Sequence, residues 1–159
     1  MSVFELFHSL QYSPLLVAMR ASPWIFAVIA SVHLMGLAVV GGAVLALDLR
    51  LLGLGLTRQP ASYVARETER WLLAGLVVMV LTGLLQFMCF AATKYYYLTS
   101  FWVKIAVLPL ALLFTFTVRR RVALADAARV RPLWNRVVAI ASLGLWLTVG
   151  IAGRLIGLP

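Results

Sequence analysis

The sequence is poor in the residues that build covalent cross-links and metal sites. A single cysteine, Cys89, cannot form an intrachain disulfide or supply an iron–sulfur or thiolate zinc site. The only histidines are His8 and His33, too few for a histidine-rich metal cage. Charged residues make up 12% of the chain, against about 25% in soluble domains. That scarcity argues against a soluble enzyme, a disordered tail or a nucleic-acid-binding domain.

Apolar residues are abundant instead, at 64% of the 159 residues. They gather in four runs, at 24–47, 71–92, 101–118 and 137–158. A membrane-crossing helix needs about 20 residues, and these runs are too long and too continuous for membrane strands. The sequence therefore predicts an all-α membrane protein with one domain, residues 1–159, in contact with the lipid bilayer.

Basic residues are unevenly distributed between the runs. The second connection contains only Lys94, whereas the first and third are rich in arginine. The positive-inside rule then predicts that the arginine-rich connections are cytoplasmic and that both termini are periplasmic, in a bacterial inner membrane. The short second connection makes its helices antiparallel neighbours, which predicts an antiparallel four-helix bundle. The arginines are Arg50, Arg58, Arg66 and Arg70 in the first connection, and Arg119, Arg120, Arg121, Arg129, Arg131 and Arg136 in the third.

The segment 1–21 precedes the first run. Its apolar and polar residues separate onto different faces, which predicts a short interfacial helix. Ser13-Pro14 and Ser22-Pro23 each place a capping residue before a proline, a pattern typical of helix starts.

Four polar side chains fall within the apolar runs, one in each: His33, Gln86, Lys104 and Arg154. All four are predicted to lie in the outer half of the bilayer, with His33 about 14 Å from the outer edge. Ionisable groups at such depth are costly and mark functional sites by default. Plainer roles stay open, because Lys104 and Arg154 are able to snorkel to the interface and Gln86 to bond a neighbouring helix.

His33 is the strongest candidate, because it is too deep to snorkel. A neutral imidazole is a good axial ligand for iron, so we predict that His33 is the metal ligand of a haem b. Gly36, one turn along, leaves room for a flat macrocycle, and Lys104 with Arg154 would pair with the two propionates. The alternatives are a structural hydrogen bond at His33 and plain helix packing at Gly36.

The second axial ligand is open. Met79 shares a face with Thr82 and Gln86 and lies roughly level with His33. A methionine ligand would raise the haem potential, although methionine is more often core filler. An open sixth position and a histidine from a second subunit are the other possibilities.

The charged residues near the cytoplasmic side carry two further expectations. Asp48, at the end of the first run, is expected to neutralise an arginine of the other loop. The mixed charges of 66–70 favour a solvated helix end, with pairing to Arg119–Arg121 as the alternative.

The stretch from Ser22 to Leu54 resembles a family of small bacterial membrane proteins of unknown function, which has an interfacial segment and four transmembrane helices. The residues that carry the resemblance are His33, Gly36, Asp48, Leu49, Arg50 and Gly53. The later run G-L-L-Q-F and the pattern Y-Y-Y-x3-F-x2-K, which ends at Lys104, are also similar to that family.

Two characterised families are more distantly similar. One is the haem-containing, four-helix protoporphyrinogen oxidase family, whose pattern would correspond here to His33, Gly36, Glu69, Arg70 and Lys104. The other is the membrane domain of copper-resistance proteins of the CopD type. These resemblances imply a haem-sized site at His33.

The function we predict is haem b binding with electron transfer in the periplasmic half of the membrane. The partner would be a redox protein or quinone, and a homo- or hetero-oligomer is compatible with the sequence. Alternatives are an enzyme of porphyrin oxidation and a non-catalytic accessory or metal-transport subunit.

Overall fold

The protein is described by a computed structural model that covers residues 5, 8–9, 11–91, 93–125 and 132–157. All regular secondary structure among the described residues is helical. Four helices, at Pro23–Leu52, Ala61–Phe90, Thr99–Leu124 and Pro132–Ile156, are long and apolar enough to cross a membrane. This confirms the predicted all-α membrane architecture. The elements are α2 (Pro14–Ala21), α3 (Pro23–Leu52), α4 (Ala61–Phe90), the 3-10 turn η1 (Tyr95–Tyr97), α5 (Thr99–Phe114), the π-helical turn η2 (Thr115–Arg119), α6 (Arg120–Leu124) and α7 (Pro132–Ile156).

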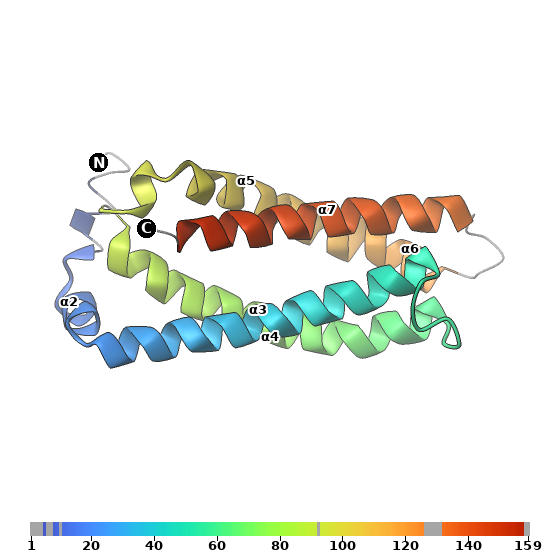
Figure 1. Ribbon diagram of the computed structural model, residues 1–159, viewed down its shortest axis with the longest axis horizontal. Helices are drawn as coiled ribbons and strands as arrows, with labels where there is room; N and C mark the ends of the chain where they lie inside the picture. Colours follow the sequence, from blue (N-terminus) through green and yellow to red (C-terminus); the bar gives the residue numbers. More distant parts are fainter. Residues whose placement is uncertain (1–4, 6–7, 10, 92, 126–131, 158–159) are drawn as a thin grey trace.

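The long helices run antiparallel, as Figure 1 shows. α2, η1 and the last turn of α7 lie at one end of the bundle, and we call this the terminal end. The α3–α4 connection and α6 lie at the opposite end, which we call the arginine-rich end. The described parts of the two arginine-rich connections therefore lie at the same end of the bundle, as predicted from the distribution of basic residues. Arg129 and Arg131 lie outside the described residues.

The predicted side-chain cap is present at the start of α3, whereas Ser13 makes no such hydrogen bond at the start of α2. Pro14 and Pro23 occupy first-turn positions of α2 and α3, and the Ser22 hydroxyl accepts a hydrogen bond from the Ile25 amide. At the other end of α3, Gly53 adopts a left-handed conformation with φ of 79° and closes the helix. The interfacial segment predicted for 1–21 includes α2, while residues 1–4, 6–7 and 10 lie outside the described part.

The helices are longer than the apolar runs at the arginine-rich end. α3 continues to Leu52 rather than ending at Leu47, and α4 begins at Ala61 rather than at Trp71. The polar residues there extend the same helices, because charged side chains are compatible with helix outside the apolar layer. The predicted limits Ala92 and Leu158 lie outside the described residues.

The bundle consists of two helix pairs. α3 packs most extensively on α4 and α5 on α7, and α3 also contacts α7. The α3–α4 crossing depends on Gly75, because a Cβ there would lie 2.8 Å from Val40 Cγ2 and 3.3 Å from the Gly36 carbonyl oxygen. Small residues at such crossings let two backbones approach closely.

Among the described residues, the two clusters of buried apolar side chains lie toward the arginine-rich end, and further buried residues, such as Leu16 and Tyr95, lie at the terminal end. The buried residues of α3 begin at Gly36 and end at Leu51, and they pack with Leu72, Val64 and Ala139 of the other helices. From 24 to 35, no described residue of α3 is buried. Many large apolar side chains around the bundle are exposed, including Leu34, Val77, Leu110 and Ile140, as expected for helices that contact lipid. The two halves of the bundle are therefore packed differently.

Candidate functional site

His33 lies on α3 facing α4. Its Nδ1 is 2.8 Å from the Thr82 hydroxyl oxygen, and the Thr82 hydroxyl donates to the Val78 carbonyl oxygen over 2.6 Å. A hydroxyl has one proton to donate, so the Thr82 oxygen accepts from His33, and the imidazole proton lies on Nδ1. The other nitrogen, Nε2, then has a free lone pair. This tautomer is the one that a metal ligand through Nε2 requires.

A glycine on α4 leaves space for the imidazole ring. A Cβ at position 83 would lie 3.2 Å from His33 Cε1, which is tighter than ordinary van der Waals contact. Gly83 thus lets the ring lie against α4 next to Thr82. The His33 ring is half-buried, and the described residues give Nε2 no hydrogen-bond partner.

The neighbouring candidates Gly36 and Met79 contact each other across the α3–α4 interface. A Cβ at Gly36 would lie 3.1 Å from Val78 Cγ1 and 3.2 Å from Met79 Cγ. Met79 also packs against the core cluster that contains Val40 and Leu72. In this arrangement both residues contribute to helix packing one turn from His33, and their roles as haem contacts stay predictions.

Gln86 lies one turn beyond Thr82 on α4. Its side-chain amide donates to the Thr82 carbonyl oxygen over 3.3 Å. The described hydrogen bond therefore stays within α4 and does not join two helices, because Gln86 reaches back along its own helix. Its predicted part in the cofactor site stays a prediction.

The two cations predicted at the rim differ in exposure. Lys104 of α5 is half-buried, and its Nζ lies 3.2 Å from the position that a Cβ of Gly153 on α7 would occupy. Arg154 is exposed, and its guanidinium extends along α7 toward Gly157. Lys104 is thus directed into the bundle, whereas Arg154 has the geometry of a snorkelling side chain.

An aromatic cluster covers the terminal end of the bundle. The rings of Phe87, Tyr95 and Phe101 are stacked, with centroids 5.3–5.9 Å apart. Burial raises the pKa of the Tyr95 phenol, so it stays neutral.

The Gln11 side chain forms hydrogen bonds with Thr93, which ties the N-terminal segment to the α4–α5 connection.

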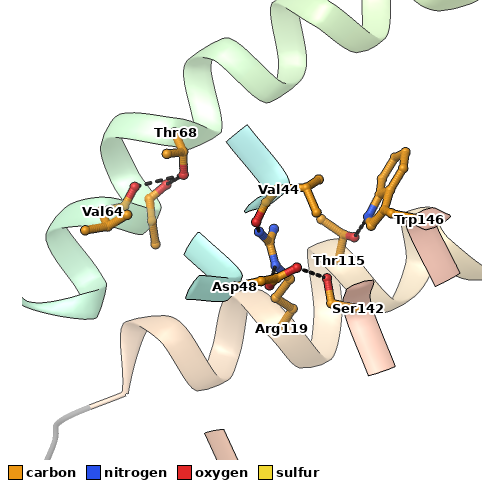
Figure 2. A network of polar contacts seen from close by, with 9 residues as sticks. Val44, Asp48, Val64, Thr68, Thr115, Arg119, Ser142 and Trp146 are labelled. Carbon is orange, nitrogen blue, oxygen red and sulfur yellow. Dashed lines mark hydrogen bonds and ion pairs between the residues drawn. The ribbon is translucent and has the colours of Figure 1, made fainter. Parts of the chain in front are cut away.

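A second polar cluster, which we call the Asp48 cluster, lies near the arginine-rich end (Figure 2). It comprises Asp48, Arg119 and Ser142. Asp48 Oδ1 accepts from Arg119 Nε and Oδ2 from the Ser142 hydroxyl, both over 2.7 Å. Arg119 also donates to the Val44 carbonyl oxygen over 2.9 Å. Asp48 and Ser142 are fully buried and the Arg119 side chain is 3% exposed. The ion pair thus joins α3 to η2, and the Ser142 hydrogen bond joins α7 to them.

The π-helical turn η2 places Arg119 in this cluster. Thr115 begins the turn, and its hydroxyl oxygen accepts from Trp146 Nε1 of α7 over 3.0 Å. π-helical turns frequently occur at functional sites, because they redirect side chains within a continuous helix. The expectation that Asp48 neutralises an arginine of the other loop is confirmed. Arg119 was expected in the loop, but it lies within the membrane helix Thr99–Leu124.

At the same end, Glu69 pairs with Arg120 over 3.0 Å and Arg70 with Glu67 over 3.1 Å. The simple solvated helix end expected for 66–70 is therefore wrong at Glu69, because α6 lies against α4. Glu69 lies about 20 Å from Thr82 along α4. The residues that carry the resemblance to the oxidase family therefore do not form one site: Glu69 and Arg70 lie at the arginine-rich end, and His33 lies in the terminal half.

Sequence reasoning did not identify Thr82, Ser142 or Arg119 as site residues. Threonine and serine are common in membrane helices, and nothing in their spacing reveals which ones face a polar partner. Within the described part of the chain, no three His, Cys, Asp or Glu residues come together in a group able to hold a metal ion. His33 is the candidate ligand that the geometry supports.

Residues 16–159 match the model of a family described as "Family of unknown function (DUF6644)". No curated protein and no solved structure matches the chain. The resemblance to a four-helix membrane family of unknown function is confirmed to this extent, while those to the oxidase and copper-resistance families stay predictions. With its four long apolar helices, the chain belongs to the DUF6644 family.

Proposed function

We propose that the protein binds haem b in the terminal half of the bundle, with His33 as an axial ligand, and that it carries electrons across this part of the membrane. The observation that carries the proposal is the hydrogen-bond chain from His33 to Thr82 to Val78. Metal-ligating histidines commonly donate their second ring N–H to a neighbouring acceptor, which fixes the tautomer and the ring orientation. A haem bound here would supply a one-electron carrier.

The residues around His33 fit such a group. Gly83 gives the ring its space, and α3 from 24 to 35 has no buried residue among those described, so this part of the helix has surface to offer a large apolar ligand. Lys104 is half-buried and has no carboxylate partner among the described residues. One propionate would satisfy it.

The remaining features of the proposal come from the sequence. The second ligand is Met79, a partner subunit's histidine, or none. The arginine-rich end is cytoplasmic and the terminal end periplasmic, so the haem lies in the periplasmic half. Electrons would pass between a periplasmic donor and a quinone or another membrane redox partner.

Topology is tested by labelling single cysteines in a Cys89→Ser background. A cysteine at Lys94 is expected to react with an impermeant reagent added outside intact cells, and one at Gln59 only after permeabilisation. Both residues lie in connections between long helices. The reverse pattern would overturn the proposed orientation.

Haem binding is tested by visible spectroscopy of the purified protein. Wild type is expected to show a Soret band that shifts on reduction. His33→Ala is expected to lose it, whereas His8→Ala keeps it. His8 is the matched control because it is the other histidine of the chain and lies before the membrane helices.

A third variant separates ligation from general damage. Thr82→Val removes the acceptor for His33 Nδ1 while keeping the side-chain volume, and second-shell losses of this kind reduce metal affinity about 10- to 100-fold. We expect weakened haem retention with an intact fold. Full haem in His33→Ala protein would end the proposal.

A further inference from the structure

Positive side chains outnumber negative ones at the arginine-rich end. Each acidic residue described there, Asp48, Glu67 and Glu69, already has one arginine partner. The remaining arginines have no carboxylate partner among the described residues. They are Arg50, Arg58, Arg66, Arg121 and Arg136. An anion from outside the chain would therefore meet cations that no described carboxylate neutralises.

Several of these arginines lie where the helices leave the apolar layer. Arg66 and Arg70 directly precede the second apolar run, which begins at Trp71, and Arg120 follows the third run. Trp71 and Trp134 are exposed at this end of the bundle. Exposed tryptophans in membrane proteins mark the level of the lipid headgroups. The arginines beside them therefore lie near the depth of lipid phosphate groups.

Three exposed arginines lie around Glu69, and we call Arg66, Arg70 and Arg120 the α4–α6 arginine cluster. Arg120 Nε of α6 lies 3.0 Å from Glu69 Oε1 of α4, which brings the two helices together. Arg66 and Arg70 lie within one turn of Glu69 and, four residues apart, share a face of α4. Arg70 binds Glu67 through Nη2 alone, and its side chain is 78% exposed. The cluster therefore retains donors for the oxygens of a phosphate, the group that guanidinium binds most specifically.

Exposed apolar side chains continue from this cluster along both helices. On α4, Leu73 and Val77 follow the two arginines at helical spacing and are 47% and 59% exposed. On the helix that ends in α6, Leu113 and Leu110 precede Arg120 and are 63% and 58% exposed. Among the described residues, α4 packs on α6 but makes only sparse contact with α5. An acyl chain is thus able to lie against apolar surface directly beside the arginines.

We propose that the α4–α6 arginine cluster binds the phosphate headgroup of an anionic phospholipid, with an acyl chain along the apolar side chains of α4 and α5. The excess of arginine selects an anionic over a zwitterionic lipid, whose own cation cancels the attraction. The depth of the cluster selects a lipid over a nucleic acid or an acidic protein, since these approach from water and do not contact the apolar side chains. Basic sites between membrane helices bind anionic headgroups in this way. The proposal does not depend on haem at His33.

The test is native mass spectrometry of the full chain in detergent, titrated with phosphatidylglycerol and with phosphatidylcholine of the same acyl chains. We expect the wild type to bind phosphatidylglycerol more tightly. Arg66→Gln is expected to weaken phosphatidylglycerol binding about fivefold, the effect of one positive charge near an anionic lipid. Adding Arg70→Gln should weaken it further, and phosphatidylcholine binding should change little in both variants.

Two variants serve as controls. Arg136→Gln removes an exposed arginine from α7, a helix that does not pack extensively on α4, so phosphatidylglycerol affinity should be unchanged. Glu69→Gln removes a negative charge from the centre of the cluster and should strengthen phosphatidylglycerol binding. The fold should tolerate this change, because partly exposed ion pairs contribute little to stability. Opposite effects of Arg66→Gln and Glu69→Gln are not expected from general loss of structure.

Equal binding of the two lipids, or wild-type affinity in the double variant at Arg66 and Arg70, would overturn the lipid site. An equal loss in Arg136→Gln would also overturn it, because the attraction would then belong to the whole end of the bundle. Free glycerol phosphate should not displace the lipid; displacement would show that phosphate alone binds. His33→Ala should lose the Soret band and keep its phosphatidylglycerol affinity, so each proposal fails independently of the other.

Discussion

Replacing Asp48 by alanine removes the carboxylate that neutralises Arg119 inside the bundle. The Arg119 side chain is 3% exposed and that of Asp48 fully buried, so water cannot take over the lost contact. Breaking one side of a buried ion pair costs about 3–5 kcal/mol. We therefore expect Asp48→Ala to lower the free energy of unfolding by that amount, more than a hundredfold in the equilibrium constant.

The cluster also predicts how a second substitution combines with the first. Ser142→Ala removes the donor to Asp48 Oδ2 and should cost about 1–3 kcal/mol. In the absence of Asp48, the Ser142 hydroxyl has lost its acceptor, so Ser142→Ala should then cost little. The double variant is expected to be nearly as stable as Asp48→Ala alone, a coupling that independent sites do not show.

Removing both charges gives the sharpest comparison. Asp48→Leu with Arg119→Met replaces the ion pair by apolar side chains, and such replacements are often neutral or stabilising. This variant should therefore be more stable than Asp48→Ala, despite its two changes.

The measurement is reversible unfolding in mixed micelles, followed by circular dichroism. Thr148→Ala is the matched control, because the Thr148 hydroxyl is exposed on α7 and bonds its own helix; its cost should stay within about 0.5 kcal/mol. A loss below about 1 kcal/mol for Asp48→Ala would refute the claim that this pair stabilises the bundle.

Two further predictions concern packing and the rim of the haem site. Gly75→Ala should lower stability by about 1–3 kcal/mol in the same unfolding assay, because its Cβ would lie 2.8 Å from Val40 Cγ2. Gly41→Ala, with no atom within 4 Å of its Cβ, should be neutral or slightly stabilising. Lys104→Gln should reduce haem retention about ten- to a hundredfold. It should also lower the midpoint potential in a redox titration, because a positive charge near the haem is lost. Arg154→Gln should have a smaller effect, and equal effects would contradict the difference in exposure between the two side chains.

The number of membrane helices and their order were predictable because they depend on long apolar runs, a property of composition alone. The helix ends at Pro23 and Gly53 were marked by capping residues, and only the first was used in the prediction. The extensions to Leu52 and from Ala61 were missed, because hydropathy reports where lipid ends and not where the helix ends.

The candidate site was predictable only in part. The depth of His33 followed from its position in the run, but its partner Thr82 depends on how α3 and α4 are rotated about their axes. Arg119 was assigned to a loop because it begins a run of three arginines. The π-helical turn instead carries it into the bundle, where Asp48 lies. Such a turn has no hydropathy signal, since it changes direction and not composition.

The two polar clusters divide the bundle in a way that bears on function. His33 and Asp48 lie on the same helix, about 22 Å apart at about 1.5 Å per residue. Around Asp48, apolar packing and the ion pair join α3, η2 and α7 in the half where the core is buried. From 24 to 35, the described residues of α3 are at most half-buried, and the His33 imidazole has no described hydrogen-bond partner at Nε2. Natural proteins tend to break packing rules at functional sites and to compensate for the cost elsewhere. Under the proposed function, the stability of the arginine-rich half would offset the cost of keeping a histidine, a lysine and an exposed helix face for haem in the terminal half.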